Sequence, residues 1–297
     1  MNLSEIIELT SEDVVKTIEE QFQPLKVQDI CRIANGLDNT VYKVNGRYVF
    51  RFPRRDIADA LMIKEGAVLP IIQQSVTLPV PHPVFYGNPT REYPFHFLGF
   101  EYMQGFGVDE IAAINPVDST PILAGFLSQL HSVPVQKVEG IVGHDEIGRL
   151  NVAKRKGFLL ENTQAIKKMG ITDTARLESY GKEVTDIKLR EEPVLVHGDL
   201  HIRNLLYQRN GVVSSVIDFG DIHVGHRACD LAIVYSILPR EQRGAFYQSY
   251  GEVSQETEEA ARFRAIFTNT ILLLSASQSD NAALMERVIV SLNNALS

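Results

Sequence analysis

Hydrophobic residues follow two different spacings along this chain, and the spacing changes near residue 104. Before that point, short alternating or continuous apolar runs predict strands over residues 27–34, 40–44, 47–52, 84–86 and 97–103. The dipeptide Asn45-Gly46 joins two of these runs and is typical of a tight hairpin turn. Two helices are also predicted: residues 11–22, beginning at the N-cap candidate Ser11, and residues 57–74, with Glu65 on or beside the apolar stripe.

Beyond residue 104, helical spacing dominates. It predicts helices over residues 120–131, 152–168, 173–188, 229–237, 240–250, 256–275 and 281–296. Residues 194–221 are the exception, because VLV, NLLYQ and VVSSVI look like short strands and Asn210-Gly211 supplies a second hairpin turn. We therefore predict an α+β protein with a β-rich N-terminal lobe, residues 1–104, and a mainly helical C-terminal lobe, residues 105–297.

The amino-acid composition restricts the classes of binding partner more than it restricts the fold class. The 297 residues are 44% hydrophobic and 22% charged, as in a globular protein large enough for two lobes. A net charge of −8 disfavours nucleic acid and anionic membrane as partners. No apolar run is long enough to span a membrane, and acidic residues stand where a signal peptide has basic ones, so we expect a cytoplasmic protein. Cys31 and Cys229, far apart and with apolar neighbours, are predicted to be reduced core residues.

One stretch, VLVHGDLHIRNLLYQRNGVVSSVIDFGD, gathers polar residues among apolar strands. His197, Asp199 and Asn204 match the spacing of a kinase catalytic loop, and Asp218 begins an Asp-Phe-Gly turn. The intervening hairpin carries Asn204 back toward Asp218, so that the two can hold Mg²⁺ while Asp199 faces the acceptor. An isolated Asp is usually a turn residue, but this ordered set favours phosphoryl transfer.

These motifs resemble the aminoglycoside phosphotransferase and choline kinase family, whose members have a protein-kinase-like fold. The resemblance rests on HGDLHIRNLL followed by VIDFGD, and GLDNTVYKVNGRYVFRFPRR near the N-terminus is also similar to the family's nucleotide-binding strands. Gly198 stands where protein kinases have Arg. The resemblance implies that Asp199 is the catalytic base or orients the acceptor hydroxyl, that Asn204 and Asp218 are the metal ligands, and that His197 braces the loop.

The same resemblance assigns residues of the N-terminal lobe to the nucleotide. Arg51 occupies the place of the usual phosphate-binding Lys, and Glu65 is its helix partner. Arginine keeps its charge at any accessible pH and has more donors than lysine, but its reach differs. The remaining nucleotide contacts are expected from a loop over the phosphates and from the hinge main chain, namely Gly36, Asn39, Thr40, Glu101 and Met103.

Asp221, His223 and Asp230 are three polar residues that follow the Asp-Phe-Gly turn. The family often has Gly-Asp-Pro ahead of the Asp that matches Asp230, whereas this chain has Gly225-His226-Arg227 there. We interpret Asp230 as a structural carboxylate that caps the helix DLAIVYSIL. Asp221 and His223 either face the acceptor or are turn residues.

We expect an enzyme that moves the γ-phosphate of ATP or GTP, with Mg²⁺, to a hydroxyl of a small molecule. The resemblance favours an aminoglycoside acceptor and thus antibiotic resistance. A macrolide 2'-phosphotransferase is the alternative, since Gly36-Leu37-Asp38 and the Phe-Arg-Phe-Pro-Arg-Arg segment also resemble that group, although the position of Asn204 is commonly His there.

Two further alternatives stay open. One is a kinase for choline-like or sugar metabolites. The other is a nucleotide-binding pseudokinase, motivated by Arg51 and by the single glycine of the phosphate loop. The sequence gives no signal for the oligomeric state.

Overall fold

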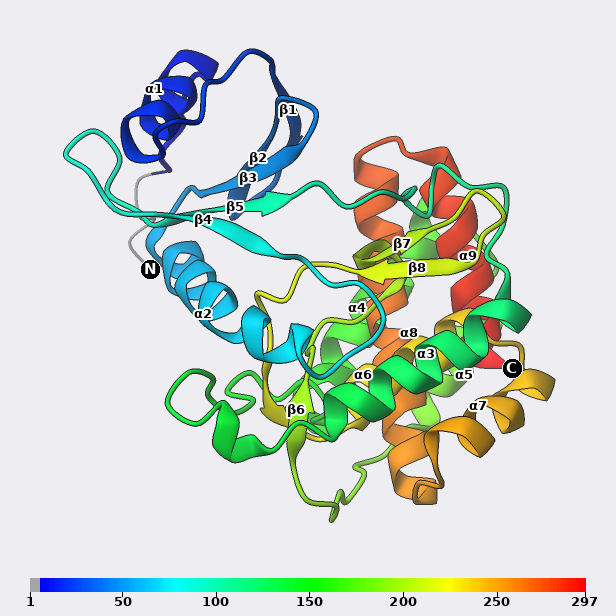
Figure 1. Ribbon diagram of the computed structural model, residues 1–297. Helices are drawn as coiled ribbons and strands as arrows, with labels where there is room; N and C mark the ends of the chain where they lie inside the picture. Colours follow the sequence, from blue (N-terminus) through cyan, green and yellow to red (C-terminus); the bar gives the residue numbers. More distant parts are fainter. Residues whose placement is uncertain (1–5) are drawn as a thin grey trace. The chain divides into compact units, whose positions relative to one another are not determined.

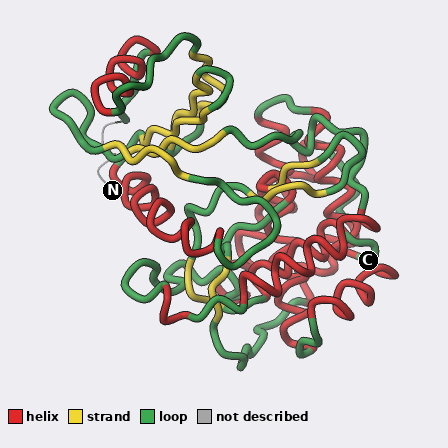
Figure 2. Tube along the Cα trace, in the orientation of Figure 1, coloured by secondary structure: helices red, strands yellow, loops and turns green. Residues whose placement is uncertain are grey.

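The computed structural model describes residues 6–297, which form two compact units. Among the described residues, the first unit comprises 6–74, 80–104 and 218–221, and the second comprises 75–79, 105–217 and 222–297. A sheet dominates the first unit and helices dominate the second (Figures 1 and 2). These elements confirm the predicted α+β class; the lobe boundary at residue 104 stays a prediction.

The sheet of the first unit has five antiparallel strands in the order β1-β2-β3-β5-β4. Their bounds are Ile30–Asn35 for β1, Asn39–Val44 for β2, Tyr48–Pro53 for β3, Pro83–Gly87 for β4 and Phe97–Glu101 for β5. Asn45 and Gly46 both have positive φ, 53° and 63°, as the predicted turn between β2 and β3 requires. Strand β3 is central, because it pairs with β2 on one side and β5 on the other.

Alternation along β3 divides its side chains between two environments. Phe50 and Phe52 are buried in an aromatic core, whereas Arg51 between them points to the opposite face of the sheet. The core also contains Val14, Ile18, Tyr42, Val44, Tyr93, Phe95 and Phe97. Val14 and Ile18 come from helix α1 (Ser11–Gln21), which thus helps to cover this face, while helix α2 (Asp56–Gln73) contacts β3, β4 and β5 (Figure 1).

Seven helices make up most of the second unit. They are α3 (Pro116–His131), α4 (Val152–Met169), α5 (Ala175–Glu183), α6 (Ala228–Ile237), α7 (Arg243–Tyr250), α8 (Gln255–Gln278) and α9 (Ala282–Leu296). Helix α8 packs against α4, α6 and α9. All ten residues of α6 are buried, which its apolar composition on every side predicts for a helix at the centre of a unit.

Two small sheets position the polar stretch in the second unit. Strand β6 (Val194–Val196) pairs with β9 (His223–Gly225), and β7 (Leu205–Tyr207) pairs with β8 (Val213–Val216). Gly211 has a φ of 81°, consistent with the hairpin turn that the sequence predicts between β7 and β8. Three short 3₁₀ turns, Val135–Lys137, Ile202–Asn204 and Arg240–Gln242, complete the regular structure of residues 6–297.

Several local predictions were wrong, mostly at helix ends. Thr10 rather than Ser11 caps α1, through a reciprocal pair of hydrogen bonds with Asp13. Helix α3 begins four residues before its predicted start, because Asn115 accepts the amide of Asp118 as N-cap and Pro116 suits the first turn. Helix α5 ends at Glu183 instead of 188, and β9 was not predicted.

Cysteine burial also differs from expectation. Cys229 is buried, as predicted, but Cys31 is exposed, because five of the six residues of β1 are exposed. Across residues 6–297, no helix combines the length and the apolar character that a membrane crossing needs.

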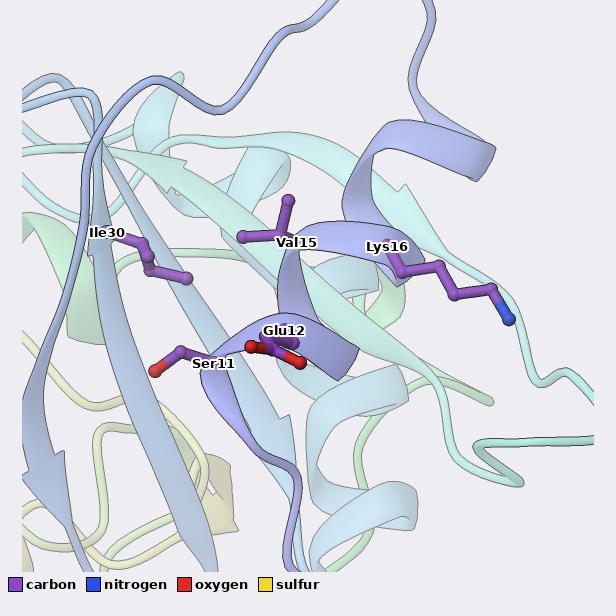
Figure 3. Close-up of a pocket in the computed structure, with 5 residues that line it drawn as sticks. All are labelled: Ser11, Glu12, Val15, Lys16 and Ile30. Atoms are coloured by element: carbon purple, nitrogen blue, oxygen red, sulfur yellow. The ribbon is translucent and has the colours of Figure 1, made fainter.

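A hollow of about 330 Å³ lies between α1 and β1. Figure 3 shows its lining, which is Ser11, Glu12, Val15, Lys16 and Ile30. None of the residues predicted to bind nucleotide, metal or acceptor is among them.

Close packing against glycine generates a first prediction. A Cβ added to Gly99 in β5 would lie 2.5 Å from the ring of Phe50, whereas one added to Gly125 in α3 meets nothing within 4 Å. We expect Gly99→Ala to destabilise the protein by about 1–3 kcal/mol. Gly125→Ala should be neutral or stabilise it by up to about 1 kcal/mol, since alanine favours helix. Urea denaturation followed by circular dichroism measures both, and equal effects would contradict the packing of β5 on β3.

Candidate active site

In the first unit, Arg51 of β3 and Glu65 of α2 form a buried ion pair. Arg51 Nη1 donates to Glu65 Oε1 at 2.8 Å and to Oε2 at 2.9 Å, and the side chain of Glu65 is only 1% exposed. Glu65 lies on the buried face of α2, with Met62, Gly66 and Leu69. Strand alternation and helical spacing thus bring together the two residues that the sequence proposed as partners.

Asp218 joins this pair. Its backbone has a φ of 66°, a left-handed conformation that Asp tolerates better than most residues. Arg51 Nη2 donates to Asp218 Oδ1 at 3.1 Å, and the following amide, of Phe219, donates to Glu65 Oε1 at 3.3 Å. Burial opposes the charge of Arg51, but the carboxylates of Glu65 and Asp218 outweigh it and raise the pKa of the guanidinium. Arg51 is therefore a permanent cation between two acidic side chains.

The segments predicted to surround a nucleotide also lie in the first unit. Gly36, between β1 and β2, donates its amide to the carbonyl of Asn39 at 2.9 Å, so residues 36–39 form a turn. Arg54 Nη1 donates to the carbonyl of Gly36, and Arg55 Nε donates to Asp38, which ties this turn to the end of β3. Asn39 Oδ1 is buried without a hydrogen-bond partner.

The remaining predicted nucleotide contacts fall at strand ends. Thr40 is the second residue of β2, and its hydroxyl donates to Asn35 Oδ1 at 3.2 Å. Glu101 is the last residue of β5, and Met103 lies in the segment that follows. Tyr102, between them, donates its amide to the carbonyl of Arg47 and receives the ammonium of Lys43 over its ring at 3.6 Å.

In the second unit, the loop after β6 carries His197, Gly198 and Asp199. His197 is fully buried; its Nε2 donates to the carbonyl of Ile217 at 3.0 Å, and its Nδ1 accepts the amide of Asp199 at 3.3 Å. A carbonyl can only accept, so Nε2 carries a proton and the ring links two parts of the chain. This geometry fits the prediction that His197 supports the loop.

Asp230 of α6 holds the backbone of the same loop. Its Oδ2 accepts the amide of His197 at 2.7 Å and its Oδ1 accepts the amide of Gly198 at 2.9 Å. Gly198 has a φ of 87°, which explains why glycine occupies this position. Asp230 is indeed structural, but the prediction that it caps its own helix was wrong, because both amides belong to the loop.

A third donor completes the surroundings of Asp230. His131 Nε2 donates to Asp230 Oδ2 at 3.1 Å, and the hydroxyl of Tyr250 contacts His131 Nδ1 at 2.7 Å. Burial raises the pKa of Asp230, but the hydrogen bond from His131, the neighbouring imidazoles and the backbone amides outweigh it and lower the pKa. Asp230 is therefore held as a carboxylate in the interior of the unit.

The carboxylate of Asp199 lies between two basic side chains. Arg264 of α8 donates from Nη2 to Oδ1 at 3.0 Å, and His201 Nε2 lies 3.4 Å from Oδ2. Burial raises the pKa of Asp199, but His201, Arg264 and His197 together hold it well below its usual range. With its side chain 35% exposed, Asp199 is an ionised acceptor that a hydroxyl can still reach.

Asn204 ends the 3₁₀ turn of this loop. Its Nδ2 donates to the carbonyl of Asp199 at 2.9 Å, which leaves Oδ1 as the acceptor of the side chain. Its own carbonyl accepts the amide of Ile217 at 2.9 Å, so the β7–β8 hairpin brings the chain back to the residue that precedes Asp218. No set of three or more His, Cys, Asp or Glu able to hold a metal occurs in residues 6–297.

Two residues at this site were missed by sequence reasoning. His201 lies within the catalytic-loop motif, so its proximity to Asp199 could have been suspected. Arg264 lies 65 positions away in a helix with no motif around it, and only tertiary packing reveals it. His223, for which an acceptor role was left open, is buried in β9, and Asp221 belongs to the turn after Asp218 in the first unit.

The family model described as "Phosphotransferase enzyme family" (APH) matches residues 29–265. The chain belongs to this family. It is thus a kinase-type phosphotransferase, and the pseudokinase alternative loses its support.

Solved structures of similar fold agree with this family. A GDP complex of wild-type aminoglycoside 2'-phosphotransferase-IIIa is 21% identical, with a TM-score of 0.66 over 97% of this chain and 99% of that one. A GDP and kanamycin complex of APH(2")-IIIa is 22% identical, with a TM-score of 0.64 over 95% and 97%. Macrolide 2'-phosphotransferase type I is 18% identical, with a TM-score of 0.61 over 97% and 99%. The predicted protein-kinase-like fold is confirmed.

The buried carboxylate of Asp230 generates a prediction for this phosphotransferase. Asp230→Asn replaces one accepting oxygen by a donor that faces other donors, so we expect a loss of about 3 kcal/mol or more in the free energy of unfolding. Asp29→Asn, at an exposed position before β1, is the matched control and should stay within about 0.5 kcal/mol of the original protein. Equal stability of the two variants in urea denaturation would contradict the role of Asp230.

The same residue predicts a pH dependence. Because the pKa of Asp230 is lower in the folded chain than its unfolded value of about 3.9, its contribution is complete above that value and is lost as the pH falls through the folded pKa. The stability difference between the original protein and Asp230→Asn should therefore be constant from about pH 5 to 7 and shrink below about pH 4. Urea denaturation at a series of pH values measures it. A difference that grows on acidification would contradict this sign.

Proposed function

We propose that this phosphotransferase moves the γ-phosphate of ATP or GTP to a hydroxyl of a small molecule, with Asp199 orienting that hydroxyl. The observation that carries the proposal is the Asp199 carboxylate, which is ionised and partly exposed on a loop whose backbone is fixed by Asp230. The GDP complexes of similar fold support a nucleotide donor.

In the transfer, the acceptor oxygen attacks the γ-phosphorus and the bond to the bridging oxygen of the diphosphate breaks, which releases the nucleoside diphosphate. The proton of the hydroxyl passes to Asp199. A carboxylate with so low a pKa is a weak base, so its main contribution is to align the hydroxyl, with proton transfer following as the new bond forms. A loose phosphoryl transition state suits this late transfer, because it needs little activation of the nucleophile.

Arg51 is proposed as the cation for the nucleotide phosphates. A guanidinium has five N–H donors; Arg51 contacts both oxygens of Glu65 through Nη1 and Asp218 through Nη2, which leaves further N–H groups for phosphate oxygens. A lysine in this place has three donors in all and could not serve both carboxylates and a phosphate as fully. We also propose that Gly36, Asn39 and Thr40 lie along the phosphates and that Glu101 and Met103 contact the base.

Asn204 and Asp218 are proposed as the ligands of Mg²⁺. Both offer oxygen donors, which Mg²⁺ prefers, and the Oδ1 of Asn204 is left available because Nδ2 is engaged. When bound, the metal would neutralise charge on the phosphates of the donor.

We propose an aminoglycoside as the acceptor, in keeping with the family resemblance of the catalytic motifs and with the kanamycin complex of similar fold. A macrolide is the second candidate, supported by the likeness to macrolide 2'-phosphotransferase type I. Either acceptor would make the protein an antibiotic-resistance enzyme.

The proposal is tested by transfer of labelled γ-phosphate from ATP and from GTP to a panel of aminoglycosides, macrolides, choline and sugars. We expect a labelled aminoglycoside, and about 10²–10⁴-fold slower turnover for Asp199→Asn with little change in nucleotide affinity. If a macrolide is labelled and no aminoglycoside is, the proposed acceptor changes from an aminoglycoside to a macrolide. Undiminished turnover in Asp199→Asn would remove Asp199 from the reaction.

The metal assignment is tested by nucleotide binding with and without Mg²⁺. Affinity of the original protein should rise with the metal, and Asp218→Ala should lose this increase because the ligand oxygens are gone. Isothermal titration measures it, with Asp29→Ala, at an exposed position in the first unit, as the control that keeps the increase. The same increase in Asp218→Ala would contradict the assignment.

A further inference from the structure

Arg264 is a buried arginine in the middle of α8. Its side chain is 10% exposed, and its neighbours on the helix, among them Ala260, Ala261, Phe263 and Phe267, are buried and apolar. A buried guanidinium is costly unless a partner compensates its charge. The carboxylate that it contacts is that of Asp199, at 3.0 Å.

Other cations near Arg264 have partners of their own. Arg149 pairs with Asp145 at 2.9 Å, and Arg155 donates to the carbonyls of Ile147 and Gly148. Burial and then the positive charge of Arg264 lower the pKa of Arg155. An apolar side chain could fill this part of the interior without adding a third positive charge to those of Arg149 and Arg155. The arginine at position 264 is therefore explained by its contact with Asp199.

The helices that hold Asp199 are themselves in contact. Asp230 of α6 fixes the backbone of the loop at His197 and Gly198, and Arg264 of α8 fixes the side chain at Asp199. Helices α6 and α8 pack on each other over an extensive surface. The loop backbone and the Asp199 carboxylate are therefore anchored to one rigid pair of helices.

The contact with Arg264 leaves the Asp199 carboxylate able to accept a hydrogen bond from the acceptor hydroxyl. Each oxygen of a carboxylate accepts two hydrogen bonds, so one bond from Arg264 to Oδ1 leaves room for an acceptor hydroxyl. This hydrogen bond restricts rotation of the Asp199 carboxylate about its χ angles. Restriction matters because misplacement of a catalytic group by about 1 Å can lower the rate about 10²-fold.

We propose that Arg264 is a positioning residue for the transfer reaction, which orients the Asp199 carboxylate toward the acceptor hydroxyl. The inference rests on the proposed role of Asp199. Arg264 acts through Asp199, the carboxylate that it contacts.

A double-mutant cycle of Arg264→Met and Asp199→Asn tests this. Turnover is measured as transfer to kanamycin, or as phosphate release from ATP with water as acceptor if kanamycin is not phosphorylated. We expect Arg264→Met to lower kcat about 10- to 100-fold with less than a threefold change in KM for ATP, and Arg264→Lys to recover part of the loss. The double variant should be as slow as Asp199→Asn alone, because the two residues act as one unit.

Arg262→Met is the matched control. Arg262 lies on the same helix and donates to the carbonyl of Ala295 at 2.9 Å, so its loss affects packing of α9 but not Asp199. Its kcat should stay within twofold of the original. Guanidinium added to Arg264→Ala should restore part of kcat, which a general loss of folding would not allow.

The possible outcomes separate the inference from the proposed function. Full kcat in Arg264→Met, or additive losses in the double variant, would overturn the inference while a slow Asp199→Asn still supports the proposed function. An Asp199→Asn variant as fast as the original would overturn both. A loss in Arg264→Met that Asp199→Asn masks supports both.

Discussion

The candidate active site depends first on one buried carboxylate, that of Asp230. It accepts the amides of His197 and Gly198 and a hydrogen bond from His131, so the loop after β6 is held in a left-handed turn that only glycine adopts easily. Because Asp230 lies on the fully buried helix α6, its hydrogen bonds anchor the loop to the core of its unit. The position of Asp199 follows from that anchor.

Two guanidinium groups then orient the carboxylates of the two units. In the first unit, Arg51 holds Glu65 and Asp218 through one planar group; in the second, Arg264 holds Asp199. In both places an arginine orients acidic side chains while leaving lone pairs available for metal, nucleotide or acceptor. Local chemistry of this kind fits a phosphotransferase in which positioning and electrostatics dominate.

Sequence reasoning found what local spacing encodes. The strands around Asn45-Gly46 and the loop from His197 to Asn204 follow from short motifs and periodicity. The pairing of Arg51 with Glu65 follows from the family resemblance. It failed where a contact joins distant segments, as for Arg264 with Asp199 and His131 with Asp230, 65 and 99 positions apart. Helix ends were also misplaced, because a cap such as Asn115 or Thr10 decides them within one residue.

The central claim is that Asp199 acts in the chemical step and not in binding. A single-turnover experiment, with enzyme in excess over labelled ATP and acceptor saturating, measures that step directly. The account predicts that Asp199→Asn binds ATP with unchanged Kd and transfers the phosphate at least about 10²-fold more slowly. Equal single-turnover rates for the two proteins would contradict it.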